Sequence, residues 1–138
     1  MKIILDDGAK MPTKAHFTDA GYDLYARESL IIGAKESATI DTGVHVELPV
    51  GTVGFIKSRS GLMFKHEIIA GEGVIDCGFN ASIGVKLFNL SGKDYKVNAG
   101  DRICQLVILK LADVGELELV EQFEETERGS NGFGSSGR

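Results

Sequence analysis

Short runs of alternating apolar and polar residues recur along the chain. In residues 44–48 the apolar side chains fall on one face of an extended chain and the polar side chains on the other, and residues 83–87 repeat the pattern. This period of two is typical of a strand that is buried on one face. Residues 103–111 are apolar on both faces and predict a central strand. Turn signals such as residues 6–8 and 99–101 recur about every ten residues, a spacing typical of an all-β sandwich or barrel.

Length and composition indicate a single soluble domain. The chain has 138 residues, of which 43% are hydrophobic, and this is enough to bury a core. The net charge of −5 argues against broad electrostatic binding to nucleic acid or acidic lipid. No apolar run approaches the ~18 residues of a membrane span, and the first ten residues do not resemble a signal peptide. We therefore expect a cytoplasmic protein that contacts neither membrane nor nucleic acid.

The two cysteines do not have the spacing of a metal site. Cys77 and Cys104 are each flanked by residues typical of strands. We therefore expect both to be buried free thiols in a reducing cytosol.

The segment KSRSGL at residues 57–62 has the residue types of an anion site. Arg59 offers a planar fork of donors, Ser60 a hydroxyl, and Gly61 allows backbone N–H groups to approach an anion closely. A short helix is expected at residues 61–66, and the positive end of its dipole would add to the attraction. The alternative is a polar loop with an incidental arginine.

Three further polar residues stand in apolar surroundings. Asp76 follows Val74 and Ile75 at a strand end and could orient a water molecule as a general base, or simply cap a turn. Asp23 could face a metal ion, a water molecule, an arginine or the solvent. Gln105 lies in the strand that is apolar on both faces, where an unsatisfied amide would cost roughly 1–3 kcal/mol, so it needs a backbone or ligand partner.

The last twelve residues, 127–138, cannot pack a core. Their glycines and serines favour disorder when the segment is alone. Around a polyphosphate the segment would gain charge-assisted hydrogen bonds, and Phe133 could stack on a flat group such as a nucleobase for roughly 1–3 kcal/mol. The groups that would hold the phosphates are Arg128, Gly134, Ser135 and Ser136. The alternative is a frayed chain end.

Five ordered motifs resemble those of the trimeric dUTP pyrophosphatase (dUTPase) family. They are AGYDLYA, PVGTVGFIKSRSGL, GEGVIDCGF, AGDRICQLV and ERGSNGFGSSG, and the match runs from about residue 14 to the C-terminus. The resemblance implies a jelly-roll-like β-barrel at residues 1–126, assembled as a homotrimer with three active sites at subunit interfaces. Residues 127–138 would be a lid that closes over a neighbour's site. The implied activity is hydrolysis of dUTP to dUMP and pyrophosphate, which keeps uracil out of DNA and supplies dUMP for dTMP synthesis.

The resemblance also implies a role for each matching residue. Asp76 would activate the attacking water, and Gln105 would lie at the α-phosphate and that water. Asp23 would hold the cofactor Mg²⁺ through bound water, whereas Arg102 would be structural. The residues implied to bind the substrate are Arg59, Ser60 and Gly61 at the phosphates, Gly73, Val74 and Ile75 at the uracil, Phe79 at the deoxyribose, Arg128 at the γ-phosphate, Phe133 stacked on the uracil, and Gly134, Ser135 and Ser136 at the phosphates.

The chain departs from the family pattern beside the implied base. Phe79 stands where the family usually has a tyrosine, and Ala81 stands where it has a glycine. We expect the preference for deoxyribose to be retained, while a weakening of it stays open. Two alternatives stay open as well: a dCTP deaminase of the same fold superfamily, and a dUTPase scaffold that binds a regulatory protein.

Overall fold

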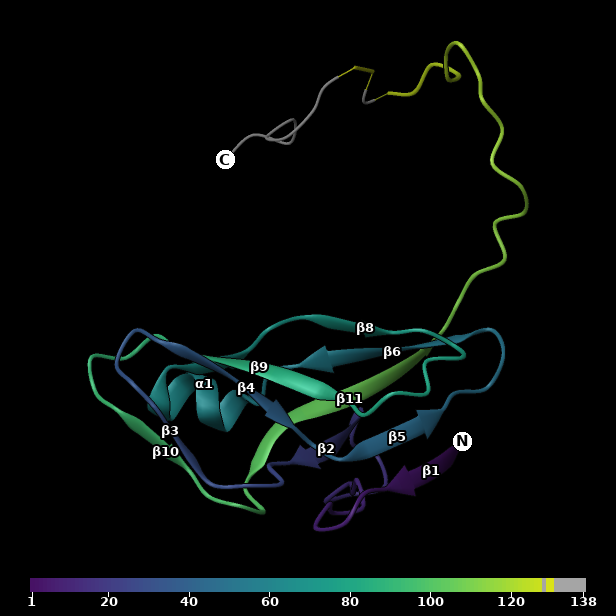
Figure 1. Cartoon of the computed structure of the whole chain (residues 1–138). Coiled ribbons are helices and arrows are strands. Elements are labelled where there is room, and N and C mark those ends of the chain that lie inside the picture. The colour runs from purple at the N-terminus through teal and green to yellow at the C-terminus, as the bar shows by residue number, and fades with distance from the viewer. Residues whose placement is uncertain (128, 131–138) are drawn as a thin grey trace.

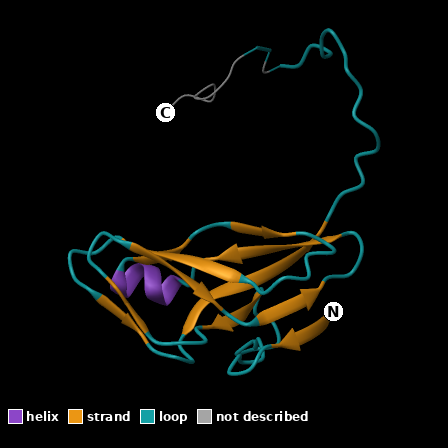
Figure 2. Cartoon of the chain, in the orientation of Figure 1, coloured by secondary structure: helices purple, strands orange, loops and turns teal. Residues whose placement is uncertain are grey.

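Antiparallel strands make up nearly all of the regular structure (Figures 1 and 2). The computed structural model describes residues 1–127 and 129–130. The elements in chain order are β1 (Lys2–Leu5), β2 (Gly21–Tyr25), β3 (Leu30–Ile32), β4 (Ser37–Asp41), β5 (Val44–Glu47), β6 (Thr52–Lys57), α1 (Ser60–His66), β7 (Ile68–Ala70), β8 (Gly73–Ile75), β9 (Gly84–Asn89), β10 (Tyr95–Val97) and β11 (Arg102–Lys110). The all-β prediction is confirmed.

The strands form four antiparallel sheets. The largest has the order β2-β11-β6-β8, and a three-stranded sheet has the order β4-β9-β7. Two pairs, β1 with β5 and β10 with β3, complete the arrangement. β11 lies between β2 and β6, so the prediction of a central strand from its two-sided apolar pattern is also confirmed.

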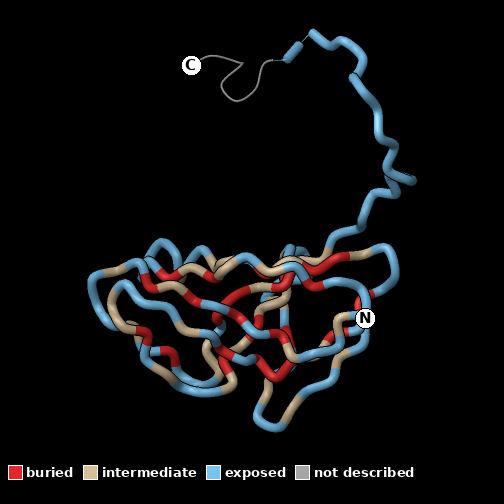
Figure 3. The backbone as a smooth tube through the Cα atoms, turned by 45° about the horizontal axis from the view of Figure 1, so that its top comes forward, coloured by how far each residue is buried: buried red, intermediate tan, exposed pale blue. Residues whose placement is uncertain are grey.

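One hydrophobic core joins the two larger sheets. Leu24 and Leu106 from one sheet and Ile40 and Leu87 from the other are fully buried in the same cluster. Figure 3 shows these buried stretches alternating with exposed ones along the strands, as a period of two requires. Burial of each such side chain contributes about 1.5–3 kcal/mol to folding.

Helix α1 begins one residue before its predicted range. It follows β6 with only Ser58 and Arg59 between them, and Arg59 is its N-cap. The helix ends at His66, and its C-cap is Glu67, whose φ of 55° is left-handed and whose N–H donates back to the Met63 carbonyl at 3.1 Å. The sequence therefore places Arg59 and Ser60 at a sharp junction of strand and helix, which holds both near the end of β6.

The expectation of two buried thiols is wrong for one of them. Cys104 is fully buried in β11, and that burial raises the pKa of its thiol to about 12. Cys77 is exposed because it falls in the turn that follows β8 rather than in the strand. The flanking residues looked strand-like, but the strand ends at Ile75.

Residues 111–127 leave the body of the sheets after β11 (Figure 1). They contain no helix or strand, and large apolar side chains among them, such as Leu117 and Phe123, are more than 90% exposed. The domain boundary expected near residue 126 stays a prediction. Within the residues that the structure describes, no helix is both long and apolar enough to cross a membrane.

Asn89 is a buried polar residue that joins three segments at the end of β9. Its amide nitrogen lies 3.0 Å from the Ile32 carbonyl, 3.0 Å from the Gly33 carbonyl and 2.7 Å from the Lys93 carbonyl. Its amide oxygen accepts from the N–H and the hydroxyl of Ser91. These bonds tie β9 to the end of β3 and to the turn before β10.

Asn89→Ala is expected to lower the free energy of unfolding by about 2–4 kcal/mol, because it removes the amide that bonds the buried Ile32 carbonyl and several partly buried backbone groups. Urea denaturation followed by far-UV circular dichroism measures this change. Asn98→Ala is the control, since Asn98 is exposed and its amide makes one bond of 3.2 Å to Asp101. Equal losses of stability in the two variants would contradict the role assigned to Asn89.

Candidate functional site

A polar pocket of about 260 Å³ lies where β2, β11 and the start of α1 meet. Asp23 is one of its lining residues, with 16% of its side chain exposed. One oxygen of Asp23 accepts from Arg59 Nε at 2.9 Å, and the other accepts from Arg102 Nη1 at 3.2 Å. The lining residues are Ala15, Asp19, Ala20, Gly21, Asp23, Arg59, Ser60, Gly61, Arg102 and Gln105.

Strand register explains why these residues meet. Gln105 of β11 lies opposite Asp23 of β2 on one side and opposite Lys57 of β6 on the other. Its Nε2 donates to the Ser58 carbonyl at 3.1 Å, so the partner that the sequence required is backbone. The amide is thereby fixed at the pocket wall, with its oxygen turned toward Gly21.

Gly21 is needed for the position of that amide. A Cβ atom at residue 21 would lie 2.7 Å from Gln105 Oε1 and 3.0 Å from Gln105 Cβ. Contacts this close would push the glutamine side chain out of place. The glycine of the AGYDLYA motif therefore makes room for the glutamine of the AGDRICQLV motif.

Arg102 belongs to this pocket, although the sequence analysis assigned it a structural role. Its guanidinium contacts Asp23, and its carbonyl accepts from Arg59 Nη1 at 3.2 Å. The register of β11 with β2 shifts between Arg102 and Cys104, which is a local bulge. Sequence spacing gave no signal of this placement, because a bulge changes which side chains face the pocket.

The pocket brings two arginines and two aspartates together, so its lining carries no net negative charge in an acidic chain. Two guanidinium groups approach one carboxylate at Asp23, and the first turn of α1 adds the hydroxyl of Ser60 and the backbone of Gly61. Arginine forks and backbone N–H groups are well suited to phosphate oxygens. This pocket can therefore bind a phosphorylated ligand in spite of the net charge of −5.

A second group of predicted site residues lies on β8 and the turn after it. β8 pairs with β6 through Gly73↔Ile56 and Ile75↔Gly54, and it is one of the two edge strands of the four-stranded sheet. Val74 is 58% exposed on this edge, whereas Ile75 is buried. The backbone of β8 can therefore hydrogen-bond to a planar ligand along its open side.

The turn after β8 carries Asp76 and Phe79. The Phe79 N–H donates to the Asp76 carbonyl at 3.0 Å, and Gly78 has a φ of 95° that favours glycine. Asp76 is exposed, and Phe79 is half-buried against the core. The chain thus presents the carboxylate to solvent while the aromatic ring is held by packing.

The two groups of residues are far apart within one chain. β8 runs antiparallel to β6, so Asp76 lies beyond Gly54, near the start of β6, while Arg59 follows its end. At ~3.3 Å per strand residue this separation is on the order of 15–20 Å. Figure 1 shows β8 ending on the side away from α1. One chain therefore does not bring Asp76 to its own polar pocket.

The remaining predicted site residues are near the C-terminus. Arg128, Phe133, Gly134, Ser135 and Ser136 lie outside the described residues. Their assigned roles stay predictions.

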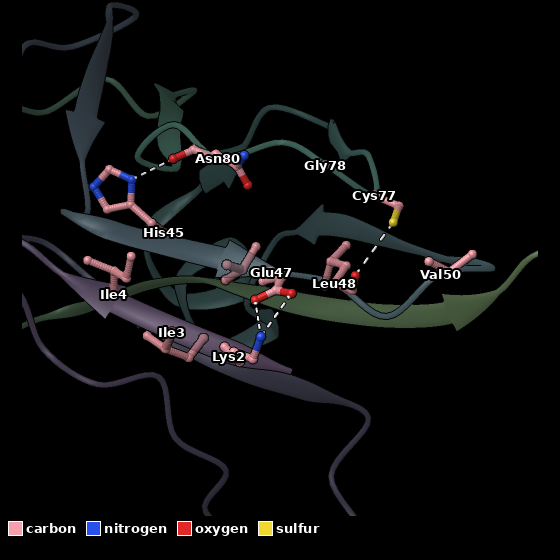
Figure 4. A pocket seen from close by; sticks show the side chains of 11 residues that line it. Lys2, Ile3, Ile4, His45, Glu47, Leu48, Val50, Cys77, Gly78 and Asn80 are labelled. Carbon is pink, nitrogen blue, oxygen red and sulfur yellow. Dashed lines mark hydrogen bonds and ion pairs between the residues drawn. The ribbon is translucent and has the colours of Figure 1, made fainter.

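A larger cavity of about 620 Å³ lies between β1, β5 and the turn after β8 (Figure 4). Its walls include Ile3, Ile4 and Leu48, and its rim carries His45 and Asn80. The described residues that line it include none of those predicted to touch a ligand. This cavity adjoins the Asp76–Phe79 turn through Cys77 and Gly78.

Comparisons with known proteins identify the family. A family model described as dUTPase matches residues 7–137. The deoxyuridine 5'-triphosphate nucleotidohydrolase of Kluyveromyces lactis is 45% identical over 130 residues, which cover 94% of this chain and 88% of that protein. The mitochondrial enzyme of the same name from Homo sapiens is 41% identical over 134 residues, covering 97% of this chain and 53% of that protein.

Solved structures agree with this result. The Staphylococcus bacteriophage 80alpha dUTPase with dUPNHPP superposes with a TM-score of 0.92 at 34% identity, covering 99% of this chain and 98% of the other. A mutant dUTPase from phage phi11 of S. aureus, described as revealing the coordination of a structural Mg(II) ion, has a TM-score of 0.82 at 32% identity over 88% of this chain and 97% of the other. The predicted dUTPase-like β-barrel is confirmed, and the chain belongs to the dUTPase family.

Proposed function

We propose that this chain hydrolyses dUTP to dUMP and pyrophosphate, so that it lowers dUTP and supplies dUMP. The observation that carries the proposal is the family match over residues 7–137, which includes every motif that contributes to the polar pocket and the β8 edge. The chemistry of these two places suits the two ends of a deoxyuridine triphosphate. The reaction is that of a dUTP diphosphatase.

The polar pocket binds the phosphates. Arg59 donates to Asp23 through Nε, which fixes the guanidinium plane and leaves other N–H groups for phosphate oxygens. Ser60 and Gly61 add a hydroxyl and an unobstructed backbone at the start of α1, where a Cβ atom on residue 61 would meet nothing within 4 Å. Gln105, held by the Ser58 carbonyl, is positioned for the α-phosphate and the attacking water.

The open edge of β8 binds the uracil. Backbone groups of Gly73, Val74 and Ile75 present donors and acceptors in a fixed order, as a pairing base does. The uracil oxygen at position 4 accepts a hydrogen bond from a backbone N–H. A 4-amino group in its place is itself a donor, so the two donors would face each other unpaired, which is costly in a closed site. A 5-methyl group would need space beside the edge, so the same backbone discriminates against thymine.

Asp76 accepts the proton of the attacking water. The water oxygen forms a bond to the α-phosphorus while the bond from that phosphorus to the bridging oxygen breaks, and pyrophosphate leaves. Arg59 stabilises the negative charge that grows on the leaving group. Phe79 lies three residues after Asp76 and packs beside the deoxyribose.

Mg²⁺ is the implied cofactor, and the residues present fit a metal that arrives with the triphosphate. The described residues contain no cluster of three or more acidic, histidine or cysteine ligands, and Mg²⁺ is often bound by one carboxylate, water and substrate phosphates. Asp23 uses one lone pair on each oxygen for an arginine and keeps others for metal-bound water. The ion, when bound, neutralises charge on the phosphates.

The complete site is shared between subunits of a homotrimer. The separation of Asp76 from Arg59 within one chain supports this arrangement, because both are needed at one substrate. Residues 127–138 would then close over the site of a neighbouring subunit. A lid of this kind excludes bulk water and fixes the geometry of the triphosphate.

Asp76→Asn is expected to lower kcat for dUTP about 10²- to 10⁴-fold, since an amide of the same shape cannot take the proton. Pyrophosphate release is measured with Mg²⁺ from dUTP, dTTP, dCTP and UTP. Asp94→Asn is the matched control, because the new amide keeps an oxygen that accepts from the Ala34 N–H. Full activity of the Asp76 variant would refute the assigned base, and little release from dUTP by the wild type would refute the function.

Mixed trimers test the shared site. Asp76→Asn and Arg59→Ala proteins, each inactive alone, are denatured together in equal amounts and refolded. A shared site needs an intact Asp76 from one subunit and an intact Arg59 from another, and each is present in half of the chains. Roughly a quarter of wild-type activity should therefore return. Wild-type protein taken through the same steps is the control. No recovery beyond the separate variants would show that each site is built from one chain.

Phe79→Tyr is expected to raise the ratio of kcat/KM for dUTP to that for UTP about 3- to 10-fold, because the added hydroxyl forms a hydrogen bond that favours the deoxyribose geometry. Steady-state kinetics on both substrates give the ratio. Phe88→Tyr adds the same hydroxyl to another half-buried ring, on β9, and serves as the control. An unchanged ratio in the Phe79 variant would count against the role of this ring.

A further inference from the structure

His45 lies between two hydrogen-bond acceptors at the rim of the larger cavity. It is on β5, and 24% of its side chain is exposed. Its Nδ1 is 2.8 Å from the Asn80 carbonyl oxygen, as Figure 4 shows, and its Nε2 is 3.1 Å from Asp6 Oδ1. A carbonyl and an ionised carboxylate can only accept, and a neutral imidazole has one N–H. Both contacts are therefore satisfied together only when His45 is an imidazolium.

The groups around His45 favour its charged form. The hydrogen bond to the Asn80 carbonyl is the largest cause of a raised pKa for His45, and Asp6 and Asp41 add to it, while desolvation opposes it. Arg27 faces the same cluster, with Nη1 3.1 Å from Asp6 and 3.0 Å from Asp41, and so fixes both carboxylates. The other charged or titratable groups that line the cavity are Lys2 and Glu47, which pair with each other at 2.9 Å, and Cys77.

The Asn80 carbonyl belongs to the segment that carries Phe79. This segment runs from the end of β8 to Ile83, whose N–H donates to the Val44 carbonyl at 2.9 Å. Ser82 is tied to Asp41 by its hydroxyl. The contact of Asn80 with His45 lies between these anchors and the Asp76–Phe79 turn. It is the first of these contacts in the chain after Phe79.

We propose that His45, as an imidazolium that donates to both the Asn80 carbonyl and the Asp6 carboxylate, is a positioning residue that holds the Phe79 turn in the geometry for dUTP. The inference rests on the proposed function and adds to it a residue outside the five motifs. It also gives dUTP binding a dependence on pH through a group that does not touch the substrate. Deprotonation of His45 removes one of its two donors, and the segment after Phe79 is then held less firmly.

The direction of the effect follows from the raised pKa. The pKa of His45 is raised in the folded protein above its ordinary value of 6.5. The stabilising contribution of its charged form is therefore fully present below pH 6.5 and is lost as the pH rises through the raised pKa. KM for dUTP should therefore rise with pH in this window. The kcat should change little, because Asp76 and the polar pocket are not in contact with His45.

The test compares wild type and His45→Gln in the full chain with Mg²⁺ from pH 5.5 to 9. Glutamine can donate to the Asn80 carbonyl but carries no charge. The variant should have a KM about fivefold above that of the wild type at pH 6, a kcat within about twofold, and a KM that converges with the wild-type value at pH 9. His66→Gln is the matched control and should follow the wild type, since His66 contacts Tyr95 at the end of α1, away from both halves of the site.

A ratio of the two KM values that stays constant with pH would overturn the inference, because a purely structural loss has no reason to titrate.

Proton NMR of the ring gives a second readout that needs no substrate. The ring signal that disappears in His45→Gln is the signal of His45. Its titration midpoint should lie above pH 6.5 in the wild type and at a lower pH in Asp6→Asn. Titration at or below 6.5 would overturn the inference as well. Absence of dUTP hydrolysis by the wild type at every pH would refute the proposed function and this inference with it, whereas hydrolysis with parallel pH profiles refutes the inference alone.

Discussion

The register of β11 with its two neighbours is the constraint on which the rest of the structure depends. Gln105 is paired with Asp23 on one side and with Lys57 on the other. A slip of one residue would turn every side chain of β11 to the opposite face, exposing Cys104 and Leu106 and burying Gln105. Burial of those apolar side chains therefore fixes the glutamine at the pocket. The same register brings Arg59 and Arg102 to the single carboxylate between them.

β8 forms an open edge of the four-stranded sheet. An edge strand has unpaired backbone groups that favour association with another strand, and proteins usually protect them. β8 has three residues and ends at a turn, which limits such pairing. Its short open edge suits a planar ligand instead. The polar pocket follows the end of β6, whereas Asp76, after β8, lies beside its start, so assembly of the chains, rather than the fold of one chain, would unite them.

The turn that joins the edge to the core is held by polar contacts in addition to the packing of Phe79. Asp76 and Cys77 are exposed, and the turn is tied to the body by the Cys77 thiol at the Leu48 carbonyl, by His45 at Asn80 and by Asp41 at Ser82. Polar contacts at a surface can be exchanged for water at small cost. The turn therefore depends on exchangeable polar contacts in addition to the packing of Phe79, whereas Gln105 lies between buried neighbours in β11.

Sequence alone predicted several of the strands, the helix and the residue types of the site. Alternation identified β5 and β9, the two-sided apolar run identified β11 as central, and the KSRSGL segment predicted the position of Arg59 at the start of α1. These are local properties, because the period of a strand and the chemistry of a turn are written in adjacent residues. The exposed position of Cys77 was missed because the end of β8 is decided by its pairing with β6, not by its own composition.

Tertiary structure alone decided which distant residues meet. Arg102 and Asp23 are in contact because β11 and β2 pair around a bulge, and His45, Asp6 and Asn80 come from three separate segments. Neither spacing nor residue type could predict these contacts, since strand pairing joins residues that are far apart in sequence. Tertiary structure also places Asp76 away from Arg59 within one chain, two residues that the family resemblance assigned to a site shared between subunits. The chain sequence thus determined the chemical groups, and the antiparallel pairing of its strands determined their neighbours.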